Sequence, residues 1–360
     1  MKTIKFEENK EQDLFYTSLR GQVNEYLRMH RFDGFATPQV WTKAVFYLGL
    51  QIGLYLFLLN GDLSLGTSLI VWSALGINGV LIGLNISHDA AHHSLSPNKG
   101  LNDCIYRLTF NALGANAHLW QMRHIQSHHL FPNVDDCDAD IDDNPIIRLS
   151  PHKQRYGFQK WQHLYAPFVY LFYTLVWILI KDFIILSKQR LANLKDIHHP
   201  QREIRIFYLA KFIYFFYLLA IPVWCMSLPW GQVLTGFLFM HFAQSYTFIF
   251  GLIASHFSME TAFPKVDQEG NLPRSWAKHQ VATSLDYHAT EAWANFIFGG
   301  FNAHVAHHLF PQISHVHYPA ISAIIQQQAL VFRIPYHQTT FPKAIASHFR
   351  YLKKLGRGGV

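Results

Sequence analysis

The chain has 360 residues, half of them apolar and 16% aromatic, with a formal net charge of +7. Its apolar residues gather into runs that can cross a hydrocarbon core of ~30 Å, which takes about 20 helical residues. The basic excess on such a chain favours an anionic membrane surface over a nucleic-acid partner, and three scattered cysteines without CxxC spacing exclude a disulfide framework and a zinc ribbon.

In chain order, residues 1–40 form a charged arm that lacks the apolar core of a signal peptide, so we expect it in the cytosol. Transmembrane helices are predicted at four places, and the tail after residue 330 is expected in the cytosol. A fifth apolar segment, 165–180, ends at Lys181 and Asp182 after 16 residues, and it is predicted as an interfacial helix. The four predicted spans are residues 41–60, 66–87, 206–226 and 232–257, within a membrane domain of residues 41–330.

The distribution of lysine and arginine predicts the orientation of these spans. The connectors 61–65 and 227–231 contain neither residue type, whereas the arm, the stretch 88–205 and the part after residue 258 are rich in both. By the positive-inside rule the two connectors face outward, and the four spans form two hairpins. The sequence therefore predicts an all-α, multi-pass membrane protein with a helical cap on the cytosolic face.

Histidines gather in three clusters that follow the predicted hairpins. Residues three and four apart share a helix face, so each cluster can direct several imidazoles at one point. The pentapeptide HHLFP ends two of the clusters, where its proline disfavours further helix. The clusters are HDAAHH (His88, His92, His93), HIQSHH (His124, His128, His129) and HVAHH (His304, His307, His308).

Imidazole suits iron, copper, nickel and zinc, and eight or nine such ligands exceed the coordination sphere of one ion, so two ions are implied. Within the acidic run 135–143, one or two aspartates are expected to orient ligand histidines, as are Asp89 and Asp286. His241 lies ~22 Å along a helix from His256, too far to reach the same metal. It is interpreted as a buried polar contact or as part of a tunnel wall.

The order and placement of these clusters resemble the three histidine boxes of membrane fatty acid desaturases. The match is close to bacterial acyl-CoA desaturases of the linoleoyl-CoA or front-end type, through HDAAHHSLSPNKGLND, DADIDDNPIIRLSPHKQ and GGFNAHVAHHLFPQISHVHYPAI. The resemblance implies a further ligand in SHFSMETAFP, at His256. It implies the metal ligands His88, His92, His124, His128, His129, His256, His304, His307 and His308, with Asp89, Asp138, Asp286 and Asn302 around them.

This chain departs from the family pattern at a few positions that bear on regioselectivity. His93 stands where relatives often have glycine, and it is excluded from the ligand set. His304 stands where front-end members usually have glutamine, and Ala306 replaces their usual glutamate. The second box continues with LFPN, where threonine and asparagine are more common.

The resemblance implies an O2-dependent desaturase that uses two iron ions to insert a cis double bond into an acyl-CoA or acyl-lipid chain. Such an unactivated C–H bond requires a redox metal, for which the protein supplies orientation. The haem motif HPGG does not occur, so we expect no fused cytochrome b5 and a separate ferredoxin or flavoprotein reductase. The active site is expected on the cytosolic face of a bacterial inner membrane.

Two alternatives remain at this stage. A related hydroxylase or ketolase acting on a carotenoid, alkane or sphingolipid could use the first cluster, but the third cluster and its HVHYPAI tail favour a desaturase. A histidine-rich metal transporter would place its ligands on broken helices in the middle of the membrane. Here the clusters follow the spans.

Overall fold

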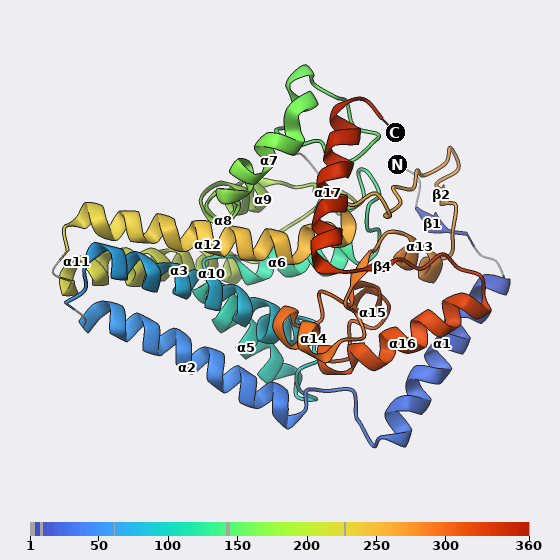
Figure 1. Cartoon of the computed structure of the whole chain (residues 1–360), viewed down its shortest axis with the longest axis horizontal. Coiled ribbons are helices and arrows are strands. Elements are labelled where there is room, and N and C mark those ends of the chain that lie inside the picture. Colours follow the sequence, from blue (N-terminus) through green and yellow to red (C-terminus); the bar gives the residue numbers. More distant parts are fainter. Residues whose placement is uncertain (1–3, 8–9, 61, 142–144, 227, 360) are drawn as a thin grey trace.

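The computed structural model describes residues 4–7, 10–60, 62–141, 145–226 and 228–359, and in these ranges the protein is mostly helical (Figure 1). Between the helices lie loops and two short parallel strand pairs. β1 (Lys5–Phe6) pairs with β2 (Asn271–Leu272), and β3 (Asp286–Tyr287) pairs with β4 (Gln338–Thr339). The helical fold expected from the sequence is confirmed.

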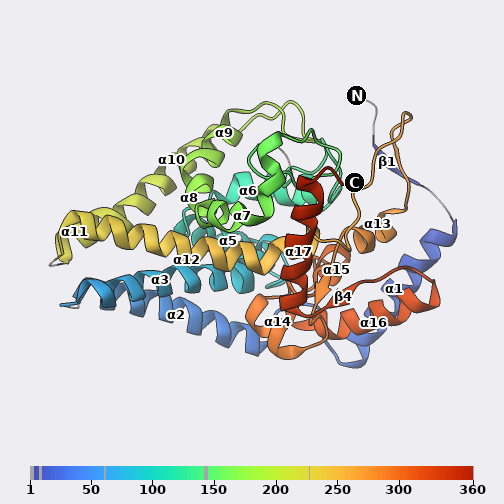
Figure 2. The same ribbon diagram turned by 45° about the horizontal axis from the view of Figure 1, so that its top comes forward.

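Four helical rods are long and apolar enough to cross a membrane, and they lie where four spans were predicted. They extend alongside one another from the end at α11 to the end where α13 to α16 gather (Figures 1 and 2). Two are single helices, α2 (Pro38–Asn60) and α12 (Trp230–His256). The others are composite: α3 (Leu65–Ile82), η1 (Gly83–Ser87) and α4 (His88–Ala91); and α10 (Gln201–Phe215), η5 (Phe216–Ala220) and α11 (Ile221–Cys225).

The fifth apolar segment is divided rather than continuous. A bend of 65° separates the helical stretch Gly157–Leu171 from Tyr173–Ser187, and Pro167 lies inside the first stretch, where it cannot donate a backbone hydrogen bond. Several large apolar side chains of the first stretch are exposed, including Phe158, Trp161 and Phe168. The segment comprises η3 (Gly157–Trp161), α7 (Gln162–Leu171), α8 (Tyr173–Val176), η4 (Trp177–Lys181) and α9 (Asp182–Ser187).

Shorter helices cover one end of the four rods. Asn98 and Asn116 cap the starts of α5 and α6 by accepting a backbone N–H from Leu101 and Leu119. α1 packs against α13 and α16, and α17 packs against α7 and α12, so both ends of the chain support this cap. These elements are α1 (Lys10–Met29), α5 (Lys99–Ala112), α6 (Ala117–Arg123), η2 (His124–His128), α13 (Trp276–Ala282), α14 (Ala292–Phe298), α15 (His304–Leu309), η6 (His315–His317), α16 (Tyr318–Val331) and α17 (Phe341–Gly356).

His241 is fully buried between the rods and forms the polar contact expected of it. Its Nδ1 lies 2.9 Å from the Thr174 hydroxyl, and its Nε2 lies 2.9 Å from the Tyr214 hydroxyl. Because both ring nitrogens are engaged, His241 joins α12 to α8 and α10 and lies apart from the three histidine clusters. A buried polar group satisfied in this way stabilises one specific packing of the helices.

α3 and α12 approach each other closely because glycines stand at their contact. A Cβ atom on Gly76 would lie 2.2 Å from the Met240 carbonyl oxygen of α12, and one on Gly236 would lie 2.2 Å from the Trp72 ring. Both distances are shorter than any van der Waals contact. Small residues therefore set the separation of these helices.

We expect Gly76→Ala to lower stability by about 1–3 kcal/mol, because the added methyl group forces α3 away from the α12 backbone. Thermal unfolding of the purified protein in detergent, followed by size-exclusion chromatography, measures the effect. Gly53→Ala is the matched control, since a Cβ atom at Gly53 in α2 meets nothing within 4 Å. Equal melting temperatures for the two variants would contradict the close contact.

Candidate metal centre

The ligand histidines lie on four segments that meet at the covered end of the rods. His88 and His92 follow the π-helical turn η1, and His256 is the last residue of α12. The second cluster lies in a π-helical turn itself, η2, where the His129 N–H donates to the His124 carbonyl 2.9 Å away. The first and third clusters have the α-helical spacing expected of them: the His92 N–H donates to the His88 carbonyl 3.1 Å away at the end of α4, and the third cluster lies in α15.

The π-helical turn has a direct consequence for the second cluster. In an α-helix, residues four apart share a face, whereas the i→i+5 bonding of a π turn brings residues five apart together. The Nε2 atoms of His124 and His129 accordingly lie 3.0 Å apart. π turns of this kind are frequent at functional sites.

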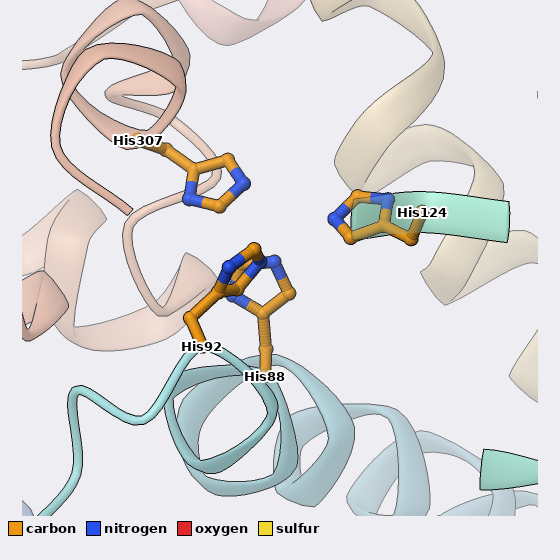
Figure 3. A group of neighbouring side chains, drawn as sticks. All are labelled: His88, His92, His124 and His307. Atoms are coloured by element: carbon orange, nitrogen blue, oxygen red, sulfur yellow. The ribbon is translucent and has the colours of Figure 1, made fainter. Parts of the chain in front are cut away.

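The nine predicted ligands form two groups of four with one histidine between them. In the first group, rings from α4, η2 and α15 converge on a common space, as Figure 3 shows. The Nε2 atom of His129 lies 3.0 Å from that of His307, and its ligand nitrogen also lies close to that of His308, which belongs to the second group. The groups are His88, His92, His124 and His307, and His128, His256, His304 and His308; within each, the candidate ligand atoms lie within 4.8 Å of one another.

The hydrogen bonds of the Nδ1 atoms show which ring nitrogen of three histidines carries a free lone pair toward the metal site. Nδ1 of His128 lies 3.0 Å from an oxygen of Asp138, Nδ1 of His256 lies 2.9 Å from the Thr283 carbonyl, and Nδ1 of His308 lies 2.9 Å from Gln280 Oε1. Each acceptor requires a proton on Nδ1, so in the neutral ring Nε2 carries a lone pair.

These lone pairs face one another at short distance. Nε2 of His256 lies 3.1 Å from that of His128, 3.0 Å from that of His308 and 2.7 Å from that of His304. Neutral rings locked in this tautomer cannot all bond to one another, and they repel unless a cation lies between them. Nε2 of His88 and of His92 are also buried without a hydrogen-bond partner in the described part of the chain. The residues present therefore fit metal ions.

Burial keeps these rings in the neutral form that binds metal. It lowers the pKa of His124 to about 4 and that of His304 to about 3, and the pKa values of His307 and His308 also lie well below the usual range. His128 differs: burial lowers its pKa too, but the adjoining Asp138 carboxylate outweighs that effect and raises the value above normal.

Four residues, Asp89, Asp138, Asp286 and Asn302, were predicted to lie around the ligand histidines. Of these, Asp138 contacts a ligand ring. It is fully buried and also accepts the Asn133 and Asp140 backbone N–H groups, which fixes the acidic loop beneath His128. Asp286 instead caps α15 by accepting the Val305 N–H at 2.9 Å, and burial raises its pKa to about 7.

The other two predicted residues, Asp89 and Asn302, form hydrogen bonds with groups outside the ligand set. Asp89 accepts bonds from Ser314 and from Nδ1 of His315, at 2.7 and 2.9 Å, and so ties the first cluster to the segment after the third. Asn302 donates to the His288 carbonyl. His93 points toward Asp103, 3.6 Å away and partly exposed, and lies outside both metal groups, in line with its exclusion.

Sequence reasoning did not single out Gln280, Thr283 or Asp140. Asp140 lies in the acidic run that was expected to hold orienting carboxylates, and its Oδ2 is 3.7 Å from Nδ1 of His124. Gln280 and Thr283 contact ligand rings from α13 and the turn after it. No motif marks them in the sequence, because their role depends on where α13 packs.

An apolar cavity of about 190 Å³ adjoins both histidine groups. It reaches His88 and His124 of the first group and His128, His256 and His304 of the second. From there it extends between the rods as far as Val80 and Gln244. Its walls are mainly apolar and include the aromatic residues Phe110, Trp120, Tyr173, Trp177, Phe248, Phe257 and Phe301. The shape and lining suit a long apolar chain, whose carbons would pass beside the metal site.

Comparison with known proteins agrees with this site. A family model described as fatty acid desaturase matches residues 66–340. The chain is 28% identical over 357 residues to an acyl-lipid (8-3)-desaturase of Physcomitrium patens, which covers 98% of this chain and 74% of the relative. It is 27% identical over 345 residues to an sn-1 linoleoyl-lipid 6-desaturase of Synechocystis sp., covering 95% and 96%. It is 31% identical over 295 residues to a chloroplastic acyl-lipid (7-3)-desaturase of Chlamydomonas reinhardtii, covering 78% and 55%.

We expect Asp138→Asn to weaken metal retention about 10–100-fold, because the carboxylate that orients His128 is lost. Elemental analysis after dialysis against graded chelator measures the bound metal. Asp103→Asn removes the carboxylate near His93, outside the site, and is expected to leave retention unchanged. If both variants retain metal as the parent chain does, Asp138 orders the acidic loop and makes no contribution to metal binding.

Proposed function

Because the chain belongs to the fatty acid desaturase family, we propose that it is an O2-dependent fatty acyl desaturase that inserts a cis double bond into an acyl-lipid or acyl-CoA chain. The observation that carries this proposal is the pairing of two histidine groups with one apolar cavity. A carbon chain in that cavity lies against both groups at once. The hydroxylase or ketolase alternative has no comparable support, since the relatives compared above are named as desaturases.

We assign the two groups to two iron ions, with His129 between them as the ninth ligand. Bound there, iron would supply the O2 activation that removal of hydrogen from an unactivated carbon requires. Nine imidazoles exceed one coordination sphere and bring no negative charge, so the ions remain strongly electrophilic. We expect elemental analysis of the purified protein to find two irons per chain and little zinc.

The chain's own residues position and isolate the reacting carbons. Asp138, Gln280 and the Thr283 carbonyl hold three ligand rings in one tautomer, and Asp286 fixes the start of α15. The aromatic walls of the cavity exclude water and confine the chain to one path. Two adjacent carbons held in a bent path beside the site favour a cis product.

Substrate linkage and partners follow from the relatives and from the family resemblance. Two of the compared relatives are named as acyl-lipid desaturases and another as a linoleoyl-lipid 6-desaturase, so we propose a front-end enzyme whose new bond lies near the carboxyl end. An acyl-CoA substrate is the alternative linkage. Electrons would come from a separate ferredoxin or flavoprotein reductase.

We also propose that the four rods form two transmembrane hairpins, with the metal site on the cytosolic side of a bacterial inner membrane. Residues 41–330 would form the membrane desaturase domain, flanked by the cytosolic arm and tail. The candidate spans support this arrangement, as does the lack of Lys and Arg in connectors 61–65 and 227–231. The bent segment around Phe172 would lie at the cytosolic interface without crossing.

Expression of the chain in a host that lacks polyunsaturated lipids tests the function. We expect a new double bond, located by mass spectrometry after derivatisation, and its loss in His307→Gln, because His307 completes the first histidine group. Separate analysis of the acyl-CoA and glycerolipid pools over time identifies the linkage. A hydroxylated product with no new double bond would overturn the assignment.

Cysteine labelling in intact cells tests the orientation. In a chain without native cysteines, Leu63→Cys and Pro229→Cys should react with an impermeant maleimide, and Arg190→Cys should react only after lysis. External labelling at position 190 would mean that the bent segment crosses the membrane and separates the histidine clusters.

A further inference from the structure

Arg123 is a buried cation in the wall of the largely apolar cavity. The residue is only 3% exposed, and it immediately precedes the ligand His124. The guanidinium carbon lies 5.1 Å from the centre of the Trp177 ring, which lines the same cavity. A charge in such surroundings is costly unless its donors have partners.

The guanidinium contacts the Asp140 carboxylate and the Tyr173 hydroxyl but keeps an unused donor. Nε lies 2.9 Å from Oδ1 of Asp140, which forms an ion pair. Nη1 is buried and has no hydrogen-bond acceptor among the described residues. A buried N–H group without an acceptor is destabilising, so a bound ligand that offers an oxygen here gains more than one that does not.

A fatty acyl ester carries one strong acceptor near its reacting carbons, the carbonyl oxygen. Besides the histidines, six side chains that line the cavity carry an N–H or O–H donor: Trp120, Arg123, Tyr173, Thr174, Trp177 and Gln244. Of these, Arg123 is the one with a buried donor atom that lacks a hydrogen-bond partner in the described part of the chain. Gln244, on α12, is the alternative donor against which Arg123 is compared.

The two donors would place the new double bond very differently. Gln244 precedes His256 on α12 by twelve residues, or ~18 Å of helix. A carbonyl held there would bring carbons far from the carboxyl end to the histidines. Arg123 adjoins His124, so a carbonyl held there leaves only a few carbons between the ester and the metal site. The second geometry matches the proposed front-end reaction.

We propose that the Arg123 guanidinium donates a hydrogen bond to the ester carbonyl oxygen of the acyl substrate and so fixes the carbon, counted from the carboxyl end, at which the double bond forms. This rests on the proposed desaturase function. Both an oxygen ester and a thioester offer this carbonyl, so the contact is common to acyl-lipid and acyl-CoA substrates. Asp140, which lines the same cavity, holds the guanidinium through its Nε.

A binding experiment without turnover isolates this contact. Dibrominated methyl stearate and the matching dibrominated octadecyl methyl ether, which lacks the carbonyl, are titrated into the metal-loaded protein without reductant. Bromine quenches the fluorescence of Trp120 and Trp177 in the cavity wall. Because Arg123→Met alone would strand the Asp140 charge, Asp140→Asn is compared with Arg123→Met/Asp140→Asn. Gln244→Leu is the matched control for a lost polar group.

We expect the double variant to bind the ester at least about tenfold more weakly than Asp140→Asn does, the fold-change of one charge-assisted hydrogen bond, with ether binding unchanged. Gln244→Leu should keep the preference for ester over ether. Equal weakening of ester and ether in the double variant would overturn the proposal, as would an ester-specific loss in Gln244→Leu.

Two further measurements, a thioester titration and a product analysis, complete the test. Titration of the S-methyl thioester should show the same loss on removal of Arg123, and the tighter of the two esters identifies the native linkage. On turnover, the double variant should spread the double bond over more neighbouring carbons than Asp140→Asn does. If the parent chain forms no double bond, the proposed function fails, and the ester–ether comparison still decides whether Arg123 holds the carbonyl.

Discussion

The mutual repulsion of imidazole lone pairs governs the architecture of this protein. His128, His256 and His308 are locked by outer hydrogen bonds into tautomers whose bare nitrogens face one another at 3.0–3.1 Å, inside a buried site. Such an arrangement is tolerable only around a cation, so the fold must hold the rings rigidly while the cation is absent. The rigid hold comes from outside the ligand set: an aspartate, a side-chain amide and a backbone carbonyl each accept one hydrogen bond from a ring Nδ1–H group.

The elements around the site hold the ligand rings in place against that repulsion. Asp286 caps α15, and Asp89 joins the first cluster to Ser314 and His315 after the third, so that two ligand segments far apart in sequence share one carboxylate. α1 places Phe15, Leu19 and Val23 in the same apolar core as Val305 and Leu309 of α15. The arm and the tail are therefore part of the support of the site, although the sequence suggested only charged flanks.

The features that were predicted from the sequence are those that depend on a local pattern of residues. Apolar runs predicted the four rods, and histidine spacing predicted the three clusters. The family resemblance added His256 and excluded His93, and the structure brings the nine resulting side chains together. It could not find the π-helical turns, because hydrophobic and histidine periodicity do not distinguish five-residue from four-residue bonding when a turn is short. Nor could it find Gln280, whose contact with His308 depends on the packing of α13, or the actual partners of Asp89. The last two misses share a cause: each depends on a tertiary neighbour distant in the chain.

The division of ligands between the two halves of the chain also constrains biogenesis. The first group takes His88, His92 and His124 from the first half and His307 from the second, while the second group takes only His128 from the first half. Neither group can therefore be completed on a nascent chain that stops before α15. Metal insertion would therefore follow assembly of all four rods, and a chain truncated just before its second hairpin would carry three ligands of the first group without its fourth.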